Sequence, residues 1–106
     1  MGEAVPGPSG PGTVVMELGA GVGALVLYTP AGLDGEEIEI SRAGAGLRGP
    51  GRTHSRVRPR HLPGQTRYAA VYPGLPAGRY TVWQAHTPVT AVTITGGQVS
   101  SCHWPG

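Results

Sequence analysis

Short runs of β-favouring residues, separated by Gly- and Pro-rich turns at spacings of about ten residues, constrain the fold of this chain most. The residues from 36 to 40 show the pattern clearly, because Ile38 and Ile40 alternate with Glu37 and Glu39 as on a strand with one buried face. No apolar run keeps a helical period over three turns. The predicted strands cover residues 13–18, 22–29, 36–40, 66–72, 79–84, 89–95 and 98–104. The sequence therefore predicts an all-β fold, a single antiparallel β-sandwich of about seven strands.

The length of 106 residues leaves room for one domain. Residues 1–12 hold four glycines and three prolines without periodicity and are predicted to form a disordered tail before a sandwich domain at residues 13–106. We also predict a loop at residues 43–51 and a two-residue hairpin turn at Gly96–Gly97, between the last two strands. The beginning of the chain lacks the charged and apolar regions of a secretory signal, so a cytoplasmic protein is expected.

The amino-acid composition indicates a source. Lysine, asparagine and phenylalanine are absent, whereas the chain contains 19 glycines and 11 prolines. The missing residue types use AT-rich codons, so a bacterium with a GC-rich genome is the expected source. Part of the preference for arginine over lysine then reflects codon usage.

The segment at residues 68–82 combines an apolar strand, a Leu-Pro-Ala-Gly turn and an Arg-Tyr-Thr-Val strand. This arrangement resembles the prealbumin-like β-sandwich modules, namely the Cna protein B-type repeats and the carboxypeptidase regulatory-like domains. The resemblance covers about residues 13–100 and implies that Leu75 fills the core while Tyr80 and Val82 point inward. It also implies a first hairpin, formed by residues 23–28 and a turn at Asp34–Gly35.

The resemblance does not carry the chemistry of these families to this chain. Surface modules of the Cna B type often contain a Lys–Asn isopeptide bond, and the chain has neither residue type. The prealbumin-like hydrolases end in Tyr-Arg-Gly-Ser, whereas this chain ends in Ser-Cys-His-Trp-Pro-Gly. Neither the bond nor the hydrolase activity is implied.

The basic stretch at residues 52–61 reads Arg-Thr-His-Ser-Arg-Val-Arg-Pro-Arg-His and contains four of the eight arginines. Every acidic residue precedes position 40, and every arginine follows position 41. One continuous strand would place five basic side chains on one face: Arg52, His54, Arg56, Arg58 and Arg60. Two interpretations stay open, because this face could pair with Glu37 and Glu39 of the preceding strand or bind an acidic partner. Five basic residues outnumber two glutamates, so uncompensated charge is expected.

The candidate metal ligands are the four histidines and the single cysteine: His54, His61, His86, His103 and Cys102. On one strand, His54 and His61 would point to opposite sides, as would the neighbours Cys102 and His103. Exposed or structural roles are therefore favoured over a metal site. Cys102 with a histidine could form a nucleophile pair, but its terminal position and the lack of any catalytic motif disfavour this role. The sequence thus predicts a protein that is not an enzyme and holds no cofactor.

Trp104 has two interpretations, because it could close the bottom of the sandwich or anchor a partner protein. The hypothesis from sequence is a non-catalytic protein-interaction or assembly module whose partner is an acidic protein surface or a second copy of the chain. No membrane partner is expected, since no apolar stretch approaches the roughly 18 residues of a membrane span. A nucleic acid is disfavoured as partner, since the net charge is only +2 and no nucleic-acid-binding motif is present. The alternative is a small metal-binding protein that uses His and Cys side chains. The predicted partner-binding residues are Arg52, His54, Arg56, Arg58, Arg60 and Trp104.

Overall fold

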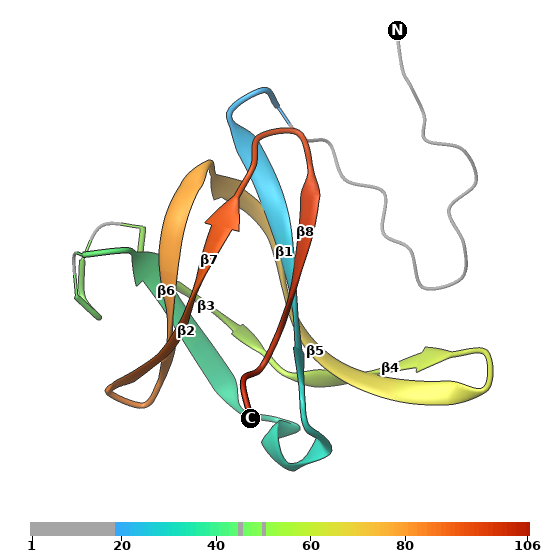
Figure 1. The fold of residues 1–106 in the computed structure, drawn as a ribbon. Coiled ribbons are helices and arrows are strands. Elements are labelled where there is room, and N and C mark those ends of the chain that lie inside the picture. The colour runs from blue at the N-terminus through green and yellow to red at the C-terminus, as the bar shows by residue number, and fades with distance from the viewer. Residues whose placement is uncertain (1–18, 45, 50) are drawn as a thin grey trace, which may run out of the picture.

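The computed structural model describes residues 19–44, 46–49 and 51–106. Within them the strands are β1 (Val22–Thr29), β2 (Glu37–Arg42), β3 (Thr53–Arg56), β4 (Arg58–Leu62), β5 (Gln65–Pro76), β6 (Gly78–Gln84), β7 (Thr87–Ile94) and β8 (Val99–His103). A short 3-10 helix, η1 (Ala31–Leu33), follows β1. Two four-stranded sheets pack face to face (Figure 1): sheet A has the order β4-β5-β1-β8, and sheet B has the order β3-β2-β6-β7.

The all-β sandwich predicted from the sequence is confirmed. The predicted strand at residues 22–29 coincides with β1, and the others differ from the observed strands by a few residues. The described residues contain eight strands: six correspond to predicted strands, and the basic stretch forms two more, β3 and β4. The described part of the chain holds no helix with the length and hydrophobicity to span a bilayer. The tail predicted at residues 1–12 and the strand predicted at residues 13–18 lie outside the described residues.

The hydrophobic core lies between the sheets and is built from alternate residues of each strand. Ile38 and Ile40 of β2 are buried, whereas Glu37, the first residue of the strand, is exposed, as the sequence pattern predicted. Leu75 is 4% exposed and Tyr80 is fully buried, which agrees with the inward positions implied by the resemblance. Burial of each such side chain contributes about 1.5–3 kcal/mol. The two sheets are also joined by a hydrogen bond, in which the Tyr72 hydroxyl donates to the Ile38 carbonyl at 2.7 Å.

Two predicted hairpins are wrong, because the strands concerned belong to different sheets. β1 lies in sheet A and β2 in sheet B, so the first hairpin implied by the resemblance does not form. β7 and β8 are divided in the same way, and β8 instead runs parallel to β1. Hydrogen bonds from Gly97 N to Val22 O (2.8 Å) and from Ala24 N to Gln98 O (2.9 Å) direct the chain at Gly96–Gly97 toward sheet A. The sandwich is therefore antiparallel except for this pair among the described strands.

The basic stretch crosses from sheet B to sheet A at Val57. β3 pairs with β2 in sheet B, whereas β4 pairs with β5 in sheet A. Val57 between them is fully buried, and it exchanges backbone hydrogen bonds of 2.9 Å with Gly35 and Glu36. The prediction that all five basic side chains share one face of one strand is therefore wrong. The physical reason is that the apolar Val57 enters the core and divides the stretch between the sheets.

Candidate functional site

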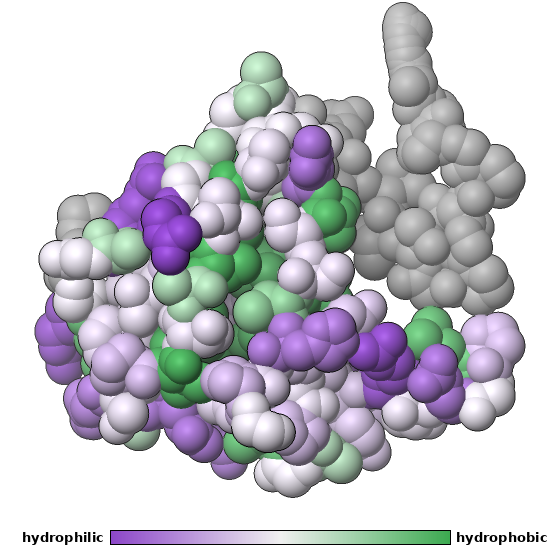
Figure 2. Space-filling model, viewed as in Figure 1, coloured by the Kyte–Doolittle hydropathy of each residue, from purple (hydrophilic) through white to green (hydrophobic). Residues whose placement is uncertain are grey.

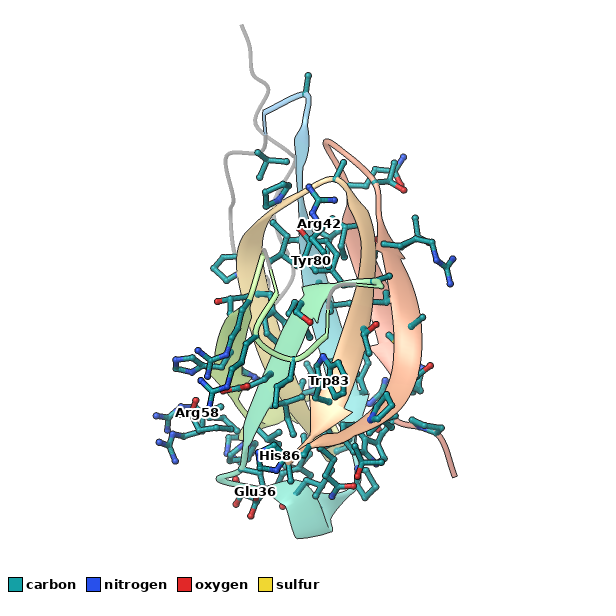
Figure 3. All side chains as sticks on the ribbon, turned by 90° about the vertical axis from the view of Figure 1, so that its left-hand side faces the viewer. Glu36, Arg42, Arg58, Tyr80, Trp83 and His86 are labelled. Atoms are coloured by element: carbon teal, nitrogen blue, oxygen red, sulfur yellow. The ribbon has the colours of Figure 1, made fainter. Side chains whose placement is uncertain are left out.

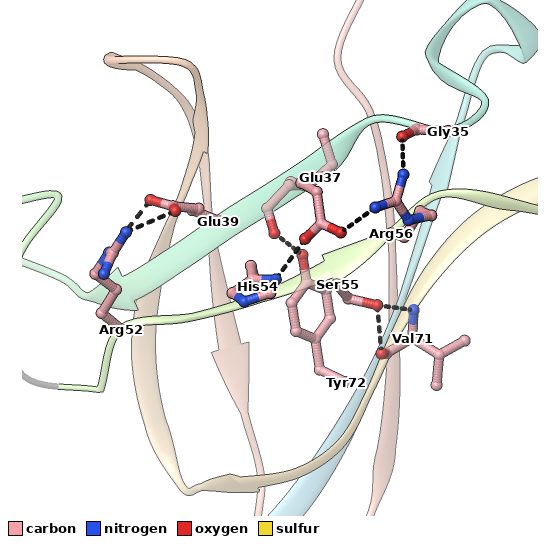
Figure 4. Close-up of polar contacts among 10 residues, drawn as sticks. Gly35, Glu37, Glu39, Arg52, His54, Ser55, Arg56, Val71 and Tyr72 are labelled. Carbon is pink, nitrogen blue, oxygen red and sulfur yellow. Dashed lines mark hydrogen bonds and ion pairs between the residues drawn. The ribbon is translucent and has the colours of Figure 1, made fainter.

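The first half of the basic stretch is paired with the glutamates of β2 on the outer face of sheet B (Figure 4). Arg52 holds Glu39 by two hydrogen bonds, from Nη2 to Oε2 at 2.8 Å and from Nε to Oε1 at 3.3 Å. His54 Nδ1 contacts one carboxylate oxygen of Glu37, and Arg56 Nη2 lies 2.9 Å from the other. For Arg52 and Arg56, the interpretation as ion pairs with the glutamates of β2 is confirmed, and His54 contacts Glu37 as that interpretation expected.

These ion pairs position β3 more than they stabilise the fold. The side chains of His54 and Glu37 are 62% and 41% exposed, so each pair contributes no more than about 1 kcal/mol. Arg56 also donates from Nη1 to the Gly35 carbonyl at 2.8 Å. On the inner side, the Ser55 hydroxyl donates to Val71 O at 2.8 Å and accepts from Val71 N at 3.2 Å. The charges of β3 are thus engaged within the protein.

The second half of the basic stretch lies on sheet A, in the hairpin of β4 and β5 that extends from the sandwich (Figure 1). Arg58 is exposed and lies on the outside of the molecule (Figure 3), and within residues 19–44, 46–49 and 51–106 it forms no ion pair. Arg60 is half-buried and donates from Nη2 to Ala69 O at 3.4 Å. Its Nε is buried without a hydrogen-bond partner in the described structure. Hydrophilic side chains gather over this hairpin (Figure 2).

The remaining arginines have different surroundings. Arg42 lies over the Tyr80 ring, with its guanidinium carbon 5.3 Å from the ring centroid, and donates to Ala77 O at 3.0 Å (Figure 3). Arg79 is exposed and donates to the Thr93 hydroxyl at 3.2 Å. A pocket of about 250 Å³ on the outer face of sheet B mixes charges of both signs, since its lining includes Glu37, Glu39, Arg48, Arg52, Trp83 and His86. That pocket does not present a single sign of charge to a partner.

Trp104 lies at one end of the sandwich, as one of the two interpretations from the sequence expected. Its side chain is half-buried and packs against the core, and its backbone N–H donates to Tyr28 O at 2.8 Å. The same residue lines a pocket of about 490 Å³ at the end of sheet A, beside Tyr28 and Tyr68. Trp104 therefore closes one end of the sandwich and also presents part of its surface to a pocket.

Sequence reasoning missed a cluster of three side chains in this pocket. The Arg67 guanidinium carbon lies 4.0 Å from the centroid of the Tyr28 ring, and the His103 ring stacks with Tyr28 at a centroid distance of 5.2 Å. Arg67 Nη2 is 3.0 Å from His103 Nε2. The three residues meet because β1 lies between β5 and β8. The sequence did not indicate this cluster, because β8 was expected to pair with β7 and instead pairs with β1.

The candidate metal ligands are dispersed over the fold. His54 contacts Glu37, His61 Nδ1 lies 3.1 Å from the Thr66 hydroxyl, and His103 contacts Arg67. In the part of the chain that the structure describes, no three His, Cys, Asp or Glu side chains come together as metal ligands. Burial raises the pKa of the half-buried Cys102 thiol, which disfavours the thiolate that a metal or a nucleophilic role requires. The alternative of a metal-binding protein therefore gains no support from these residues.

Comparisons of the chain with protein-family models, with curated proteins and with solved structures find no match. The resemblance to the prealbumin-like modules therefore stays a prediction.

Proposed function

We propose that this domain is a non-catalytic protein-interaction module that binds an acidic surface of a partner protein through Arg58 and Arg60 of β4. The observation that carries the proposal is the division of the basic stretch at Val57. Arg52, His54 and Arg56 precede the division and contact the carboxylates of β2, whereas the two arginines of β4 follow it and lie on the other sheet.

The chemistry of arginine supports this assignment. A guanidinium group binds a carboxylate through two parallel hydrogen bonds, and these bonds are stronger than those between neutral groups. Arg52 already makes this arrangement with Glu39, so binding a partner there would require the internal pair to break. Arg58 has no such pair among the described residues.

Neighbouring charge and position add to the attraction. Arg60 lies opposite Arg67 in the register of β4 and β5, so the hairpin carries a third arginine in addition to Arg58 and Arg60. A concentration of one sign of charge speeds the association of an oppositely charged partner. β4 is an edge strand of sheet A, so a partner reaches it without displacing another strand.

A pull-down with matched charge reversals tests the proposal. Wild type, Arg58→Glu and Arg79→Glu are compared in a lysate of the source organism, because both variants change the net charge equally. Arg79 is the control because it is exposed and lies on β6 of sheet B. We expect Arg58→Glu to lose a partner that wild type and Arg79→Glu retain and that high salt releases. An identical set of partners for all three proteins would contradict the proposal.

The partner could also be a second copy, because Asp34 and Glu36 are exposed carboxylates of the same chain. Size-exclusion chromatography at low and high salt separates this case. Self-association through β4 predicts an oligomer of wild type at low salt that the Arg58→Glu variant does not form.

A further inference from the structure

We propose that the pocket beside Tyr28 is a binding site for a small aromatic anion, whose carboxylate or phosphate group is held by Arg67. The pocket has a volume of about 490 Å³ and lies at the end of sheet A, where β1, β5 and β8 meet. This volume falls within the range of about 300–1,000 Å³ that is common for small-ligand sites. The site goes beyond the interaction with an acidic protein surface, because its ligand is a small molecule bound in the pocket by Arg67, which in the β4 interaction only adds to the positive charge of the hairpin.

The guanidinium group of Arg67 is held in place by two contacts of different kinds. Its face lies over the Tyr28 ring at 4.0 Å, which is a cation–π contact. Its Nη2 lies 3.0 Å from His103 Nε2, and since arginine can only donate, His103 accepts at this atom. One of the five guanidinium N–H groups is used in this way, so donors remain for a ligand. An arginine that is already oriented loses less conformational entropy when it binds an anion.

The lining of the pocket favours an anion attached to an aromatic ring. Three aromatic side chains border it: Tyr28, Tyr68 and Trp104. Among the described residues that line it, none is acidic, so no internal carboxylate competes for Arg67. The side chains of Thr29, Thr66 and Gln65 add neutral hydrogen-bonding groups at the border. A ring can stack on the aromatic walls while its acid group meets the guanidinium.

The position of His103 also supports a ligand site. Its ring stacks on Tyr28 at 5.2 Å with an angle of 26° between the planes, so Arg67 and His103 both contact the same tyrosine. The side chain of His103 is exposed, and its ring lies at the border of the pocket. An anion that enters beside Arg67 therefore meets a second nitrogen-bearing side chain.

Fluorescence titration with simple probes tests this proposal. The chain contains two tryptophans, of which Trp104 lines the pocket and Trp83 lies on sheet B, so a Trp83→Phe protein reports on the pocket alone. The probes are phenylacetate, phenyl phosphate, the uncharged phenylacetamide and the ring-free acetate. Calorimetric titration of the unmodified protein with the same probes guards against an effect of the Trp83 substitution.

We expect saturable binding of phenylacetate or phenyl phosphate, and at least tenfold weaker binding of phenylacetamide and acetate. The stronger of the two aromatic anions identifies the acid group that the site prefers. Saturable binding of neither anion, or equal binding of phenylacetamide, would overturn the proposal.

Substitutions then assign the binding to Arg67. Arg67→Gln keeps hydrogen-bonding capacity but removes the charge, and it should weaken binding of the aromatic anion at least tenfold. Arg79→Gln, the matched control, should change the affinity less than twofold, and circular dichroism with thermal unfolding verifies that both variants fold. Arg58→Glu should also leave this affinity within twofold, so failure of the pocket and failure of the β4 interaction can be told apart. Unchanged affinity in folded Arg67→Gln would assign the binding elsewhere and overturn the proposal.

Discussion

Tyr72 shows how a single side chain connects the two sheets. Its side chain is 2% exposed, and its hydroxyl donates to the Ile38 carbonyl at 2.7 Å (Figure 4). Burial raises the pKa of Tyr72 well above its ordinary value of 10.0, and the negative charges of Glu37 and Glu39 raise it further. All three causes favour the neutral phenol, which is also the form that donates the hydrogen bond.

Replacement of Tyr72 by phenylalanine should therefore have two effects. Near neutral pH the Ile38 carbonyl loses its partner, and the free energy of unfolding should fall by about 1–3 kcal/mol. Because the folded-state pKa lies above the unfolded value of 10.0, the stabilisation from Tyr72 is complete below pH 10.0 and is lost as the pH rises above it. Tyr72→Phe should remove this part of the alkaline decline. Urea unfolding of both proteins, near neutral pH and at several values above 10.0, measures both effects.

An equal alkaline decline of wild type and variant would contradict the role given to the Tyr72 hydroxyl. Cys102→Ser is a useful control, since burial also raises the pKa of that thiol from 9.0. The part of the alkaline decline that Cys102→Ser removes should begin at a lower pH than the part that Tyr72→Phe removes, because the ordinary pKa of the thiol is lower than that of the phenol.

At the scale of the elements, strand positions were predictable from the sequence, whereas sheet membership was not. Alternation at Ile38 and Ile40 identifies β2 because burial of one face leaves a period of two in the sequence. The choice between sheets depends on contacts between distant residues, such as the 2.8 Å hydrogen bond from Gly97 to Val22. The two glycines at 96 and 97 look like a hairpin turn locally, and only the position of β1 shows that they carry the chain across the sandwich.

Gly96 gives a direct test of this crossing. A Cβ atom at Gly96 would lie 2.0 Å from the backbone oxygen of Ala20, so Gly96→Ala forces the turn away from the start of β1. We expect a loss of about 1–3 kcal/mol in the free energy of unfolding, measured by urea unfolding. Gly32→Ala is the matched control, because a Cβ there meets no atom within 4 Å, and its effect should stay within about 0.5 kcal/mol. Equal stability of the two variants would show that the close approach at Gly96 does not hold the crossing.

At the scale of the whole molecule, the candidate site could be predicted only in part. The pairing of Arg52 and Arg56 with the glutamates of β2 follows from charge and neighbouring strand positions, and this pairing was among the interpretations drawn from the sequence. The division at Val57 was missed, because one valine in a basic stretch does not reveal that two sheets share the stretch. The surroundings of Arg67 were also missed, because its partners Tyr28 and His103 lie on β1 and β8, and the sequence does not show that these strands are neighbours.

The division of the basic stretch at Val57 gives its two halves different surroundings. The arginines of the first half form ion pairs with Glu37 and Glu39, so an acidic ligand must compete with these carboxylates. The second half offers Arg58 and Arg60 on a hairpin of the other sheet. An acidic ligand should therefore select β4 over β3.

Nuclear magnetic resonance titration with an acidic peptide, such as a short polyglutamate, measures this selection residue by residue. Backbone amides of β4 and the side-chain Nε–H signals of Arg58 and Arg60 should shift progressively with peptide and return with added salt. The Nε–H signals of Arg52 and Arg56 should shift far less, because their guanidinium groups remain paired. Larger shifts at Arg52 and Arg56 than at Arg58 and Arg60 would contradict the account.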